Sequence, residues 1–167
     1  MRIFVNDANI LIDLVQLGCV EAFFELNGEL CTTDFVLEEL EADQRELFKR
    51  SSMRICTSNP KLISEILELT ETNPGLSFED CTVWHHAKLL GGILVTGDGK
   101  LKRKASAGGL EVRGIIFLIE EIKNQRVREL VECISILKHL KSINPRLPIL
   151  EIDNRINAWE VELANQL

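Results

Sequence analysis

Acidic residues follow two apolar stretches of the chain, at points where we expect buried strands to end. Asp7 comes directly after RIFV (residues 2–5), and Asp98 follows ILVT (residues 93–96) within the turn sequence TGDG. In open α/β sheets the active crevice lies outside the carboxyl ends of the strands. If these two strands are neighbours, we therefore expect both carboxylates to face one crevice.

Two carboxylates in one partly desolvated crevice repel each other by a few kcal/mol. Such a pair stays ionised only when a cation lies between the two groups; otherwise one of them takes up a proton. Oxygen-only ligands suit hard divalent ions such as Mg²⁺ or Mn²⁺. The positions of Asp7 and Asp98 therefore favour a metal site, whose ion could polarise a phosphate and activate water without a protein nucleophile.

Two further acidic residues belong to the same pattern, Glu39 in TDFVLEEL and Asp80 in LSFED. Each of the four acids also has a purely structural explanation. Asp7 could cap the helix that follows it, and Asp98 could serve the glycine-flanked turn. Asp80 could form a capping box with Ser77, and Glu39 could be a solvated helix carboxylate. Their joint occurrence, with two of them at strand ends, favours a shared site.

Short apolar segments alternate with amphipathic stretches, which predicts a parallel sheet with helices on both faces. The expected strands are residues 2–5, 29–32, 53–56, 93–96 and 110–112, with 115–117 as a further candidate. The expected helices are residues 7–17, 34–49, 60–70, 77–90, 118–140 and 153–166. The predicted fold class is α/β, a three-layer α/β/α sandwich with a central, mostly parallel sheet and a C-terminal helical extension.

Four short motifs resemble those of the PIN-domain nuclease superfamily, which includes the toxins of VapBC-type toxin–antitoxin pairs. In chain order they are VNDANILID, TDFVLEEL, LSFED and LVTGDGKL, and the resemblance covers about residues 1–120. The segment at residues 112–119 also resembles a subgroup of these proteins. The motifs place the acidic residues of the family on four positions, with Glu39 favoured over Glu38: Asp7, Glu39, Asp80 and Asp98.

The resemblance implies a Mg²⁺- or Mn²⁺-dependent endoribonuclease in which these four acids are catalytic. Asp7, Asp80 and Asp98 would bind the metal, and Glu39 would hold water or a second ion. Asn9 and Thr96 would orient the carboxylates. Many family members carry another acid shortly after the last motif's Asp; this chain has Lys100, Leu101 and Lys102 there, which makes a second metal position less certain. We expect a PIN-like nuclease domain at residues 1–140 and a helical tail at 141–167 packed on the same domain.

The net charge of −7 argues at first against a nucleic-acid partner, but the charge is unevenly distributed. Residues 1–97 carry a net charge of −9, whereas residues 100–146 carry +6. Such asymmetry can mark a polyanion-binding face, although a basic run is more often a solvated surface. The basic residues after Asp98 could contact RNA phosphates: Lys100, Lys102, Arg103 and Lys104.

Other chemistries are less well supported. Five scattered cysteines without a C-x-x-C pair predict buried, reduced thiols rather than a zinc site or a disulfide framework. His85 and His86 point about 100° apart on a helix, so they do not suit one ion. A phosphoacceptor domain would have an acidic pair ending the first strand and an Asp on the third, where this chain has Asn6-Asp7 and residues 56–58, CTS.

The partners expected from the resemblance are an RNA substrate, a cognate antitoxin and a second copy of the chain in a homodimer. No apolar run is long enough to span a membrane, and the first residues, MRIFVNDANI, do not have the pattern of a signal peptide. We therefore expect a cytoplasmic location. The alternative is a non-catalytic PIN-like module that binds protein or RNA, with Ile156 and Trp159 of the tail contributing to a partner surface.

Overall fold

The computed structural model describes residues 1–167, and the chain divides into two compact units. The first unit consists of residues 1–12 and 27–114, and it contains every strand. The second consists of residues 13–26 and 115–167, and it is helical. Helix α1 (Ala8–Gln16) begins in the first unit and ends in the second. The expected domain boundary at residue 140 stays a prediction.

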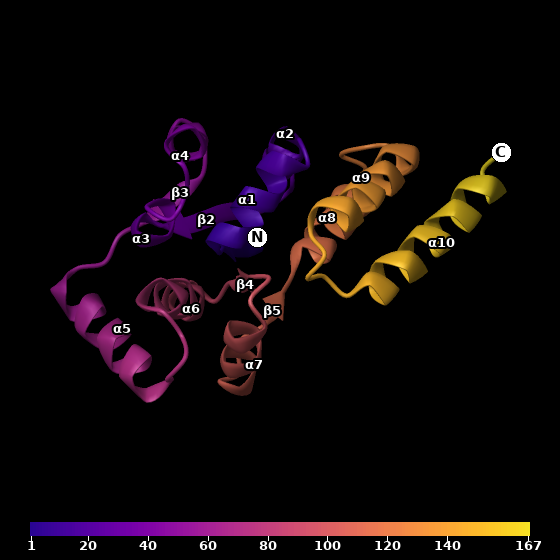
Figure 1. The fold of residues 1–167 in the computed structure, drawn as a ribbon. Helices are drawn as coiled ribbons and strands as arrows, with labels where there is room; N and C mark the ends of the chain where they lie inside the picture. The colour runs from indigo at the N-terminus through magenta and orange to yellow at the C-terminus, as the bar shows by residue number, and fades with distance from the viewer. The chain divides into compact units, whose positions relative to one another are not determined.

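The first unit is built on a five-stranded sheet in the order β3-β2-β1-β4-β5, in which every neighbouring pair is parallel (Figure 1). Its strands are β1 (Ile3–Asn6), β2 (Glu29–Thr33), β3 (Arg54–Cys56), β4 (Ile93–Val95) and β5 (Val112–Arg113). This sheet confirms the predicted α/β class with its central parallel sheet.

Strand β1 lies between β2 and β4, and its residue Phe4 pairs with Leu30 on one side and Ile93 on the other. The apolar runs in these strands form a continuous core because each central strand is covered on both faces. Phe4 and Leu94 are fully buried. The strands that precede Asp7 and Asp98 are therefore neighbours, as the crevice prediction requires.

Five helices belong to the first unit: α3 (Asp34–Leu37), α4 (Ala42–Lys49), α5 (Pro60–Thr72), α6 (Phe78–Leu90) and α7 (Gly99–Ala107). Helix α6 packs against β1, β2 and β4, and Thr82 near its start is hydrogen-bonded to Thr33 at the end of β2. It ends at Gly91, whose φ of 60° is a left-handed conformation that glycine adopts without steric cost.

The second unit is formed by the end of α1 and four further helices: α2 (Val20–Phe24), α8 (Ile115–Asn124), α9 (Leu130–Ile143) and α10 (Ile149–Asn165). Helix α9 packs against both α8 and α10. Fully buried side chains from all three, Leu118, Ile122, Leu137 and Ile152, form its core. No helix in the chain combines the length and apolar character needed to cross a membrane.

Four expected elements are wrong in detail. The helix expected at 34–49 is interrupted at residues 38–41, where Glu41 starts α4 through a capping box with Gln44. The helix expected at 118–140 is two helices, because Arg126 adopts a left-handed φ of 56° that ends α8. Residues 115–117, considered as strand, are the first turn of α8. The C-terminal helix begins at Ile149, four residues before the expected start.

Candidate functional site: an acidic cluster at the strand ends

Asp7 is the most deeply buried acid of the site, with 3% of its surface exposed. Its carboxylate accepts hydrogen bonds from the Ala8 amide (2.8 Å), from Asn9 Nδ2 (3.2 Å) and from Thr96 Oγ1 (2.7 Å). Burial raises the pKa of Asp7 to about 6, even though the donors Thr96 and Ala8 favour its ionised form. The negative charges of Asp80 and Asp98 raise it further.

Asp98 lies just beyond β4 and caps the helix that follows it. Its Oδ1 accepts a hydrogen bond from the amide of Leu101 at 2.8 Å, so the structural role considered for this residue at the turn is present. Its own amide donates to Thr96 Oγ1 at 3.1 Å. Thr96 thus links the Asp7 carboxylate to the Asp98 backbone.

Asn9 makes a second link between the ends of β1 and β4. Its Nδ2 donates to Asp7, and its Oδ1 accepts a hydrogen bond from the amide of Gly97 at 2.9 Å. Asn9 and Thr96 therefore contact both the Asp7 carboxylate and the turn that carries Asp98. Such contacts fix the orientation of a carboxylate that serves a site.

Asp80 stands in the first turn of α6. Its Oδ2 accepts a hydrogen bond from the Ser77 amide (2.9 Å), and its own amide donates to Ser77 Oγ (3.0 Å), which completes the capping box. Burial raises the pKa of Asp80, and the charges of Asp98 and Glu79 add to this, against the effect of the Ser77 hydrogen bonds. Asp80 can therefore cap α6 and still lie among the other acids.

Glu39 follows the short helix α3 on a solvent-exposed segment, yet the pKa of its carboxyl group is raised to about 7. Partial desolvation is the main cause, and the charges of Asp7, Glu79 and Asp80 contribute. Its neighbour Glu38 instead forms an ion pair with Arg45 at 3.2 Å. Glu39, and not Glu38, is thus the residue of this motif that faces the other acids.

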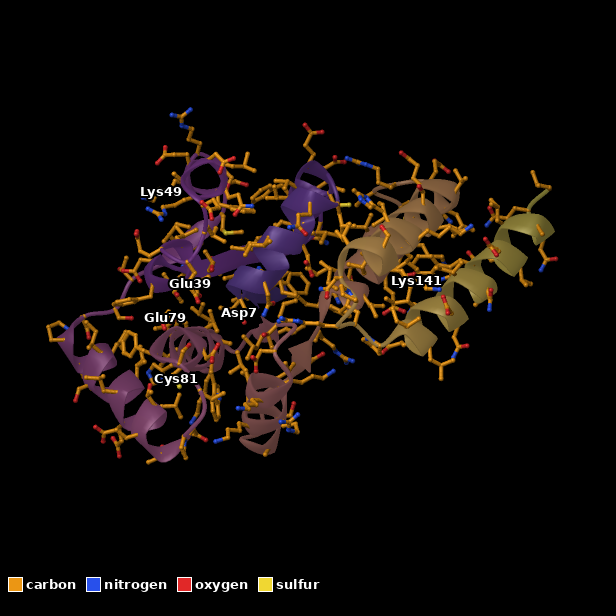
Figure 2. All side chains as sticks on the ribbon, viewed as in Figure 1. Asp7, Glu39, Lys49, Glu79, Cys81 and Lys141 are labelled. Carbon is orange, nitrogen blue, oxygen red and sulfur yellow. The ribbon has the colours of Figure 1, made fainter.

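The side chain that sequence reasoning missed is Glu79, which precedes Asp80 on α6. Its charge acts on both Glu39 and Asp80, and Figure 2 shows Asp7, Glu39 and Glu79 at neighbouring positions. Adjacent helix residues point about 100° apart, so the sequence offered no reason to choose both. We call the five residues together the acidic cluster: Asp7, Glu39, Glu79, Asp80 and Asp98.

The chain has no group of three or more His, Cys, Asp or Glu side chains that could hold a metal ion as they stand. The donor chemistry of the acidic cluster nevertheless fits Mg²⁺ or Mn²⁺, because every available donor is a carboxylate oxygen. None of the five acids forms an ion pair with Lys, Arg or His. A divalent cation would relieve the repulsion that contributes to the raised pKa values of Asp7, Glu39 and Asp80.

The basic residues after Asp98 lie in α7, and their side chains differ in what they contact. Lys104 donates a hydrogen bond from Nζ to the carbonyl of Pro74 at 2.9 Å, and the Lys100 side chain packs beside Gly75. The guanidinium of Arg103 lies near Gly99 at the start of the helix. Lys102 is exposed.

The two adjacent histidines lie outside the acidic cluster and have different partners. His85 Nε2 pairs with Glu65 of α5 at 2.9 Å, and His86 Nε2 is hydrogen-bonded to Ser58 Oγ at 2.9 Å. All five cysteines are buried and free in this structure.

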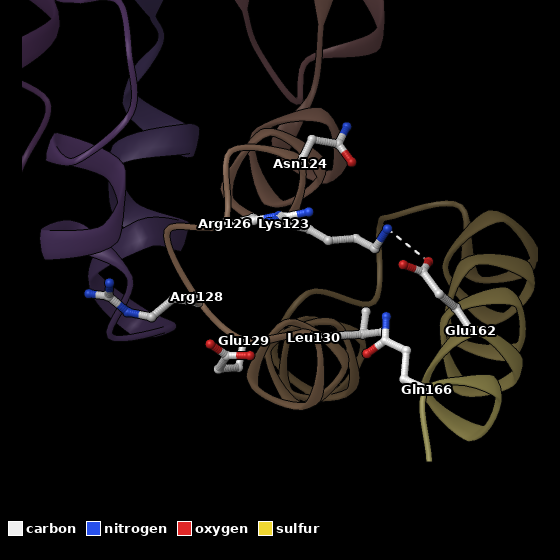
Figure 3. A pocket seen from close by; sticks show the side chains of 8 residues that line it. All are labelled: Lys123, Asn124, Arg126, Arg128, Glu129, Leu130, Glu162 and Gln166. Atoms are coloured by element: carbon white, nitrogen blue, oxygen red, sulfur yellow. Dashed lines mark ion pairs between the residues drawn. The ribbon is translucent and has the colours of Figure 1, made fainter.

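A second candidate is a pocket of about 420 Å³ in the helical unit (Figure 3). Its walls come from the α8–α9 connection and the end of α10: Lys123, Asn124, Arg126, Arg128, Glu129, Leu130, Glu162 and Gln166. Its charges are largely matched within the protein, since Lys123 pairs with Glu162 at 2.8 Å and Arg128 pairs with Glu25 at 3.0 Å. The acidic cluster, whose charges are unmatched, is the stronger candidate.

The parallel sheet and the carboxylates outside its strand ends define the class, an α/β protein with an acidic site. A protein-family model described as "DUF3368: PIN domain" matches residues 3–160. The chain therefore belongs to the PIN-domain family, which confirms the resemblance of its four motifs. PIN domains are in general nuclease domains.

Solved structures similar to the chain include PAE2754 from Pyrobaculum aerophilum, with 17% identity and a TM-score of 0.53 over 72% of this chain and 96% of that one. This likeness supports the PIN-like fold. VapBC2 from Rickettsia felis bound to a promoter DNA fragment matches with 19% identity and a TM-score of 0.49 over 67% and 98%. VapBC-1 from nontypeable Haemophilus influenzae matches with 17% identity and a TM-score of 0.48 over 68% and 98%. No curated protein matches the chain.

Proposed function

We propose that the chain is an endoribonuclease that hydrolyses phosphodiester bonds of RNA with Mg²⁺ or Mn²⁺ at the acidic cluster. The observation that carries the proposal is the gathering of five acids, none of them paired with a cation, around the ends of β1 and β4. Stability alone gives no reason to collect like charges, because each raises the free energy of the others. Membership of the PIN-domain family supports the same activity.

Asp7, Asp80 and Asp98 are the residues that we propose to bind the metal. When bound, the ion would polarise the scissile phosphate and lower the pKa of water at the site. Asp7 is held from three directions by Ala8, Asn9 and Thr96, so its position is fixed before any ion arrives. Asn9 and Thr96 are positioning residues in this scheme.

Glu39 is suited to proton transfer. A pKa of about 7 means that its carboxyl group exchanges a proton near neutral pH, which is where a general base is most effective. We propose that Glu39 accepts the proton of the attacking water. Glu79 shares the electrostatic environment of Glu39 and helps to keep that pKa high.

The substrate is proposed to be single-stranded RNA that crosses the first turns of α7. Lys100, Lys102 and Arg103 would contact the flanking phosphates, and their binding would weaken with added salt. Lys104 already donates to the Pro74 carbonyl and would contribute less. By the same family resemblance we propose a toxin-type protein of the cytoplasm that pairs as a homodimer and is silenced by a cognate antitoxin.

The direct test incubates the purified chain with a panel of RNAs and Mn²⁺, with EDTA and the Asp98→Asn variant as controls. Cleavage that requires both the metal and Asp98 is the expected result. Glu111→Gln is a matched control, because Glu111 is a carboxylate of the same unit that is paired with Arg113. Equal cleavage by the wild type and a clean Asp98→Asn preparation would refute the proposal.

One observation favours a second candidate function, a module that binds without cleaving. The cluster has no three side chains that could hold an ion as they stand. In this case neither Mn²⁺ nor Asp98 would affect binding of RNA or protein. Ile156 and Trp159, expected from the sequence to contribute to a partner surface, are instead buried in the second unit, so substitutions there would test the packing of α10 and not a partner contact.

A further inference from the structure

Two phenylalanines lie next to the acidic cluster, and the proposed metal site does not use them. Phe35 is in α3, four residues before Glu39, and Phe78 is the first residue of α6, directly before Glu79. Their rings form an edge-to-face pair, with centroids 4.9 Å apart and ring planes at 81°. The pair thus joins α3 to α6 beside two acids of the cluster.

Both rings keep part of their surface exposed, unlike the other phenylalanine and tryptophan side chains of the first unit. Those three are all buried: Phe4, Phe48 and Trp84. An edge-to-face contact uses one face of one ring and an edge of the other, so it leaves further ring faces outside the contact. Aromatic rings that are accessible in this way are the side chains on which proteins stack the bases of single-stranded nucleic acids.

The order of the strands places the two phenylalanines and the basic residues of α7 on opposite sides of Asp7. Strand β1, which ends at the residue before Asp7, has β2 on one side and β4 on the other. Helix α3 follows β2 directly, α7 follows β4, and α6 packs against both of these helices (Figure 1). A strand of RNA that crosses the acidic cluster would thus meet basic side chains at one end and aromatic rings at the other.

The charges around the two rings favour a base over a phosphate. Asp34 precedes Phe35, and Glu79 and Asp80 follow Phe78. These acids repel phosphates, whereas a nucleobase is neutral and can stack beside them. A basic, apolar peptide would also suit the rings and the acids, but it would not use the basic side chains of α7. Single-stranded RNA makes use of both sides.

A second pair of phenylalanines provides an internal contrast. Phe23 and Phe24 of α2 are also edge-to-face, with centroids 5.3 Å apart. Phe23 is fully buried and Phe24 is partly exposed. Both belong to the second unit, which carries none of the five acids of the cluster. Phe24 is therefore a matched control, a partly exposed ring in a pair of the other unit.

We propose that Phe35 and Phe78 form a nucleobase subsite, on which a base next to the scissile phosphate of single-stranded RNA stacks. The contact tolerates different sequences, because every base offers a planar face. It adds affinity and fixes which phosphate of the strand meets the acidic cluster. The subsite deepens the proposed function and rests on it, since it names the part of the substrate that lies beside the metal-binding acids.

The test is a thermodynamic cycle between the protein ring and the RNA base. A short, fluorescently labelled single-stranded RNA is synthesised with one base at a time replaced by an abasic ribose. Fluorescence anisotropy with Mn²⁺ gives its affinity for the Asp98→Asn chain, which should leave the RNA intact, with and without Phe78→Leu. Leucine keeps an apolar side chain against Phe35 but offers no ring face.

We expect Phe78→Leu to weaken binding of the intact RNA about tenfold, and loss of one particular base to have a similar effect on the chain with Phe78. The two changes together should weaken binding no more than either alone, because both remove the same stacking contact. Phe78→Tyr, which keeps the ring face, should bind like the chain with Phe78. Phe24→Leu should also leave the affinity unchanged.

Two results would overturn the subsite. An effect of Phe78→Leu that is equal for intact RNA and for every abasic RNA would show that the ring acts through packing alone. Equal binding of the intact and all abasic RNAs by the chain with Phe78 would show that no base stacks on the pair, which would leave it as a surface for a peptide. The same cycle with Phe35→Leu decides the matter if Phe78→Leu does not fold.

Failure of the subsite is distinguishable from failure of the proposed function. Cleavage that requires Mn²⁺ and Asp98, together with additive losses in the cycle, would overturn the subsite and support the nuclease. Coupled losses in the cycle, without cleavage by the wild-type chain, would support the subsite and contradict the nuclease. Absence of binding to any RNA would contradict both.

Discussion

The acidic cluster of the sheet unit and a set of acids on α8 and α10 in the helical unit differ in whether they have cationic partners. In the helical unit, four acids on α8 and α10 have a cationic partner within 3.0 Å: Glu120, Asp153, Glu160 and Glu162 pair with Arg155, Lys141, Lys138 and Lys123. In the sheet unit, the acidic cluster has no such partner. These four acids thus lie in neutral pairs, whereas those of the cluster keep an excess of negative charge in one place.

This difference indicates which charged residues lower the stability of the folded chain. Exposed ion pairs contribute little to stability, but they do not oppose folding. The acidic cluster does oppose it, since Asp7 is buried with a raised pKa. An arrangement that costs stability and lies at the carboxyl ends of parallel strands is the one expected of a functional site.

The largest expected effect is on cleavage by Asp7→Asn. The substitution removes a negative charge from the cluster and should lower kcat on the order of a thousandfold. This is at the upper end of the losses in kcat of about a hundredfold to a thousandfold seen when one group that stabilises a transition state is removed. Asp153→Asn, which removes a paired carboxylate of the helical unit, is the control and should cleave like the wild type. Single-turnover cleavage with Mn²⁺ measures the rates of both variants. Similar losses of rate in Asp7→Asn and Asp153→Asn would show that the cluster has no special role in cleavage.

The next effect is the dependence of metal-free stability on pH. Between pH 3.8 and about 6 the native chain retains the Asp7 proton that the unfolded chain has lost. This contribution to the free energy of unfolding is therefore fully present at low pH and falls as pH rises, by about 3 kcal/mol in total. Urea unfolding in EDTA measures the difference between the wild type and Asp7→Asn, which should lack this dependence; parallel pH profiles would contradict the assignment.

A smaller effect is expected for Thr96→Val, which keeps the shape of a fully enclosed side chain. The variant loses the 2.7 Å hydrogen bond to Asp7 and the acceptor for the Asp98 amide. Affinity for Mn²⁺ should fall about 10- to 100-fold, as is typical when a group that orients a ligand is lost. Calorimetric titration with Mn²⁺ gives the affinity, and Thr72→Val, altered at an exposed helix hydroxyl, is the control. Unchanged affinity for Mn²⁺ would show that Thr96 does not orient the metal-binding carboxylates.

The smallest effect concerns the helical unit. Arg155→Ala removes the cation that Glu120 and Glu151 share, and the half-buried Glu120 loses its partner. The free energy of unfolding should fall by about 1 kcal/mol, and RNA cleavage should not change. Thermal unfolding of the variant beside Arg50→Ala, which removes an exposed pair with Glu46, checks the size of the effect. A loss of cleavage without a loss of stability would place function in the helical unit.

Much of the sheet unit could be predicted because its chemistry is local in sequence. Asp7 and Asp98 each follow an apolar strand directly, and Asn9 and Thr96 lie within two residues of them. Glu79 could not be chosen in this way, because its proximity to Glu39 depends on how α6 packs against the end of β2.

The errors in the helical unit have a different origin. Residues 118–140 have an apolar pattern compatible with one helix, and Arg126 gives no sign in sequence of a left-handed conformation usually taken by glycine. The amide of Val127 reaches back to the carbonyl of Ile122 there, which ends α8. Tertiary packing of α9 against α8 and α10, rather than local propensity, fixes this turn.

The two helix caps within the acidic cluster have a consequence for which ion the proposed metal site would favour. Asp80 uses Oδ2 to hold the Ser77 amide, and Asp98 uses Oδ1 to hold the Leu101 amide, so one oxygen of each carboxylate is engaged in a helix cap. Calcium prefers many ligands and carboxylates that chelate through both oxygens, whereas magnesium accepts single oxygens and retains its water. In the proposed function, carboxylates held in this way by the bonds that start two helices would therefore favour magnesium over calcium.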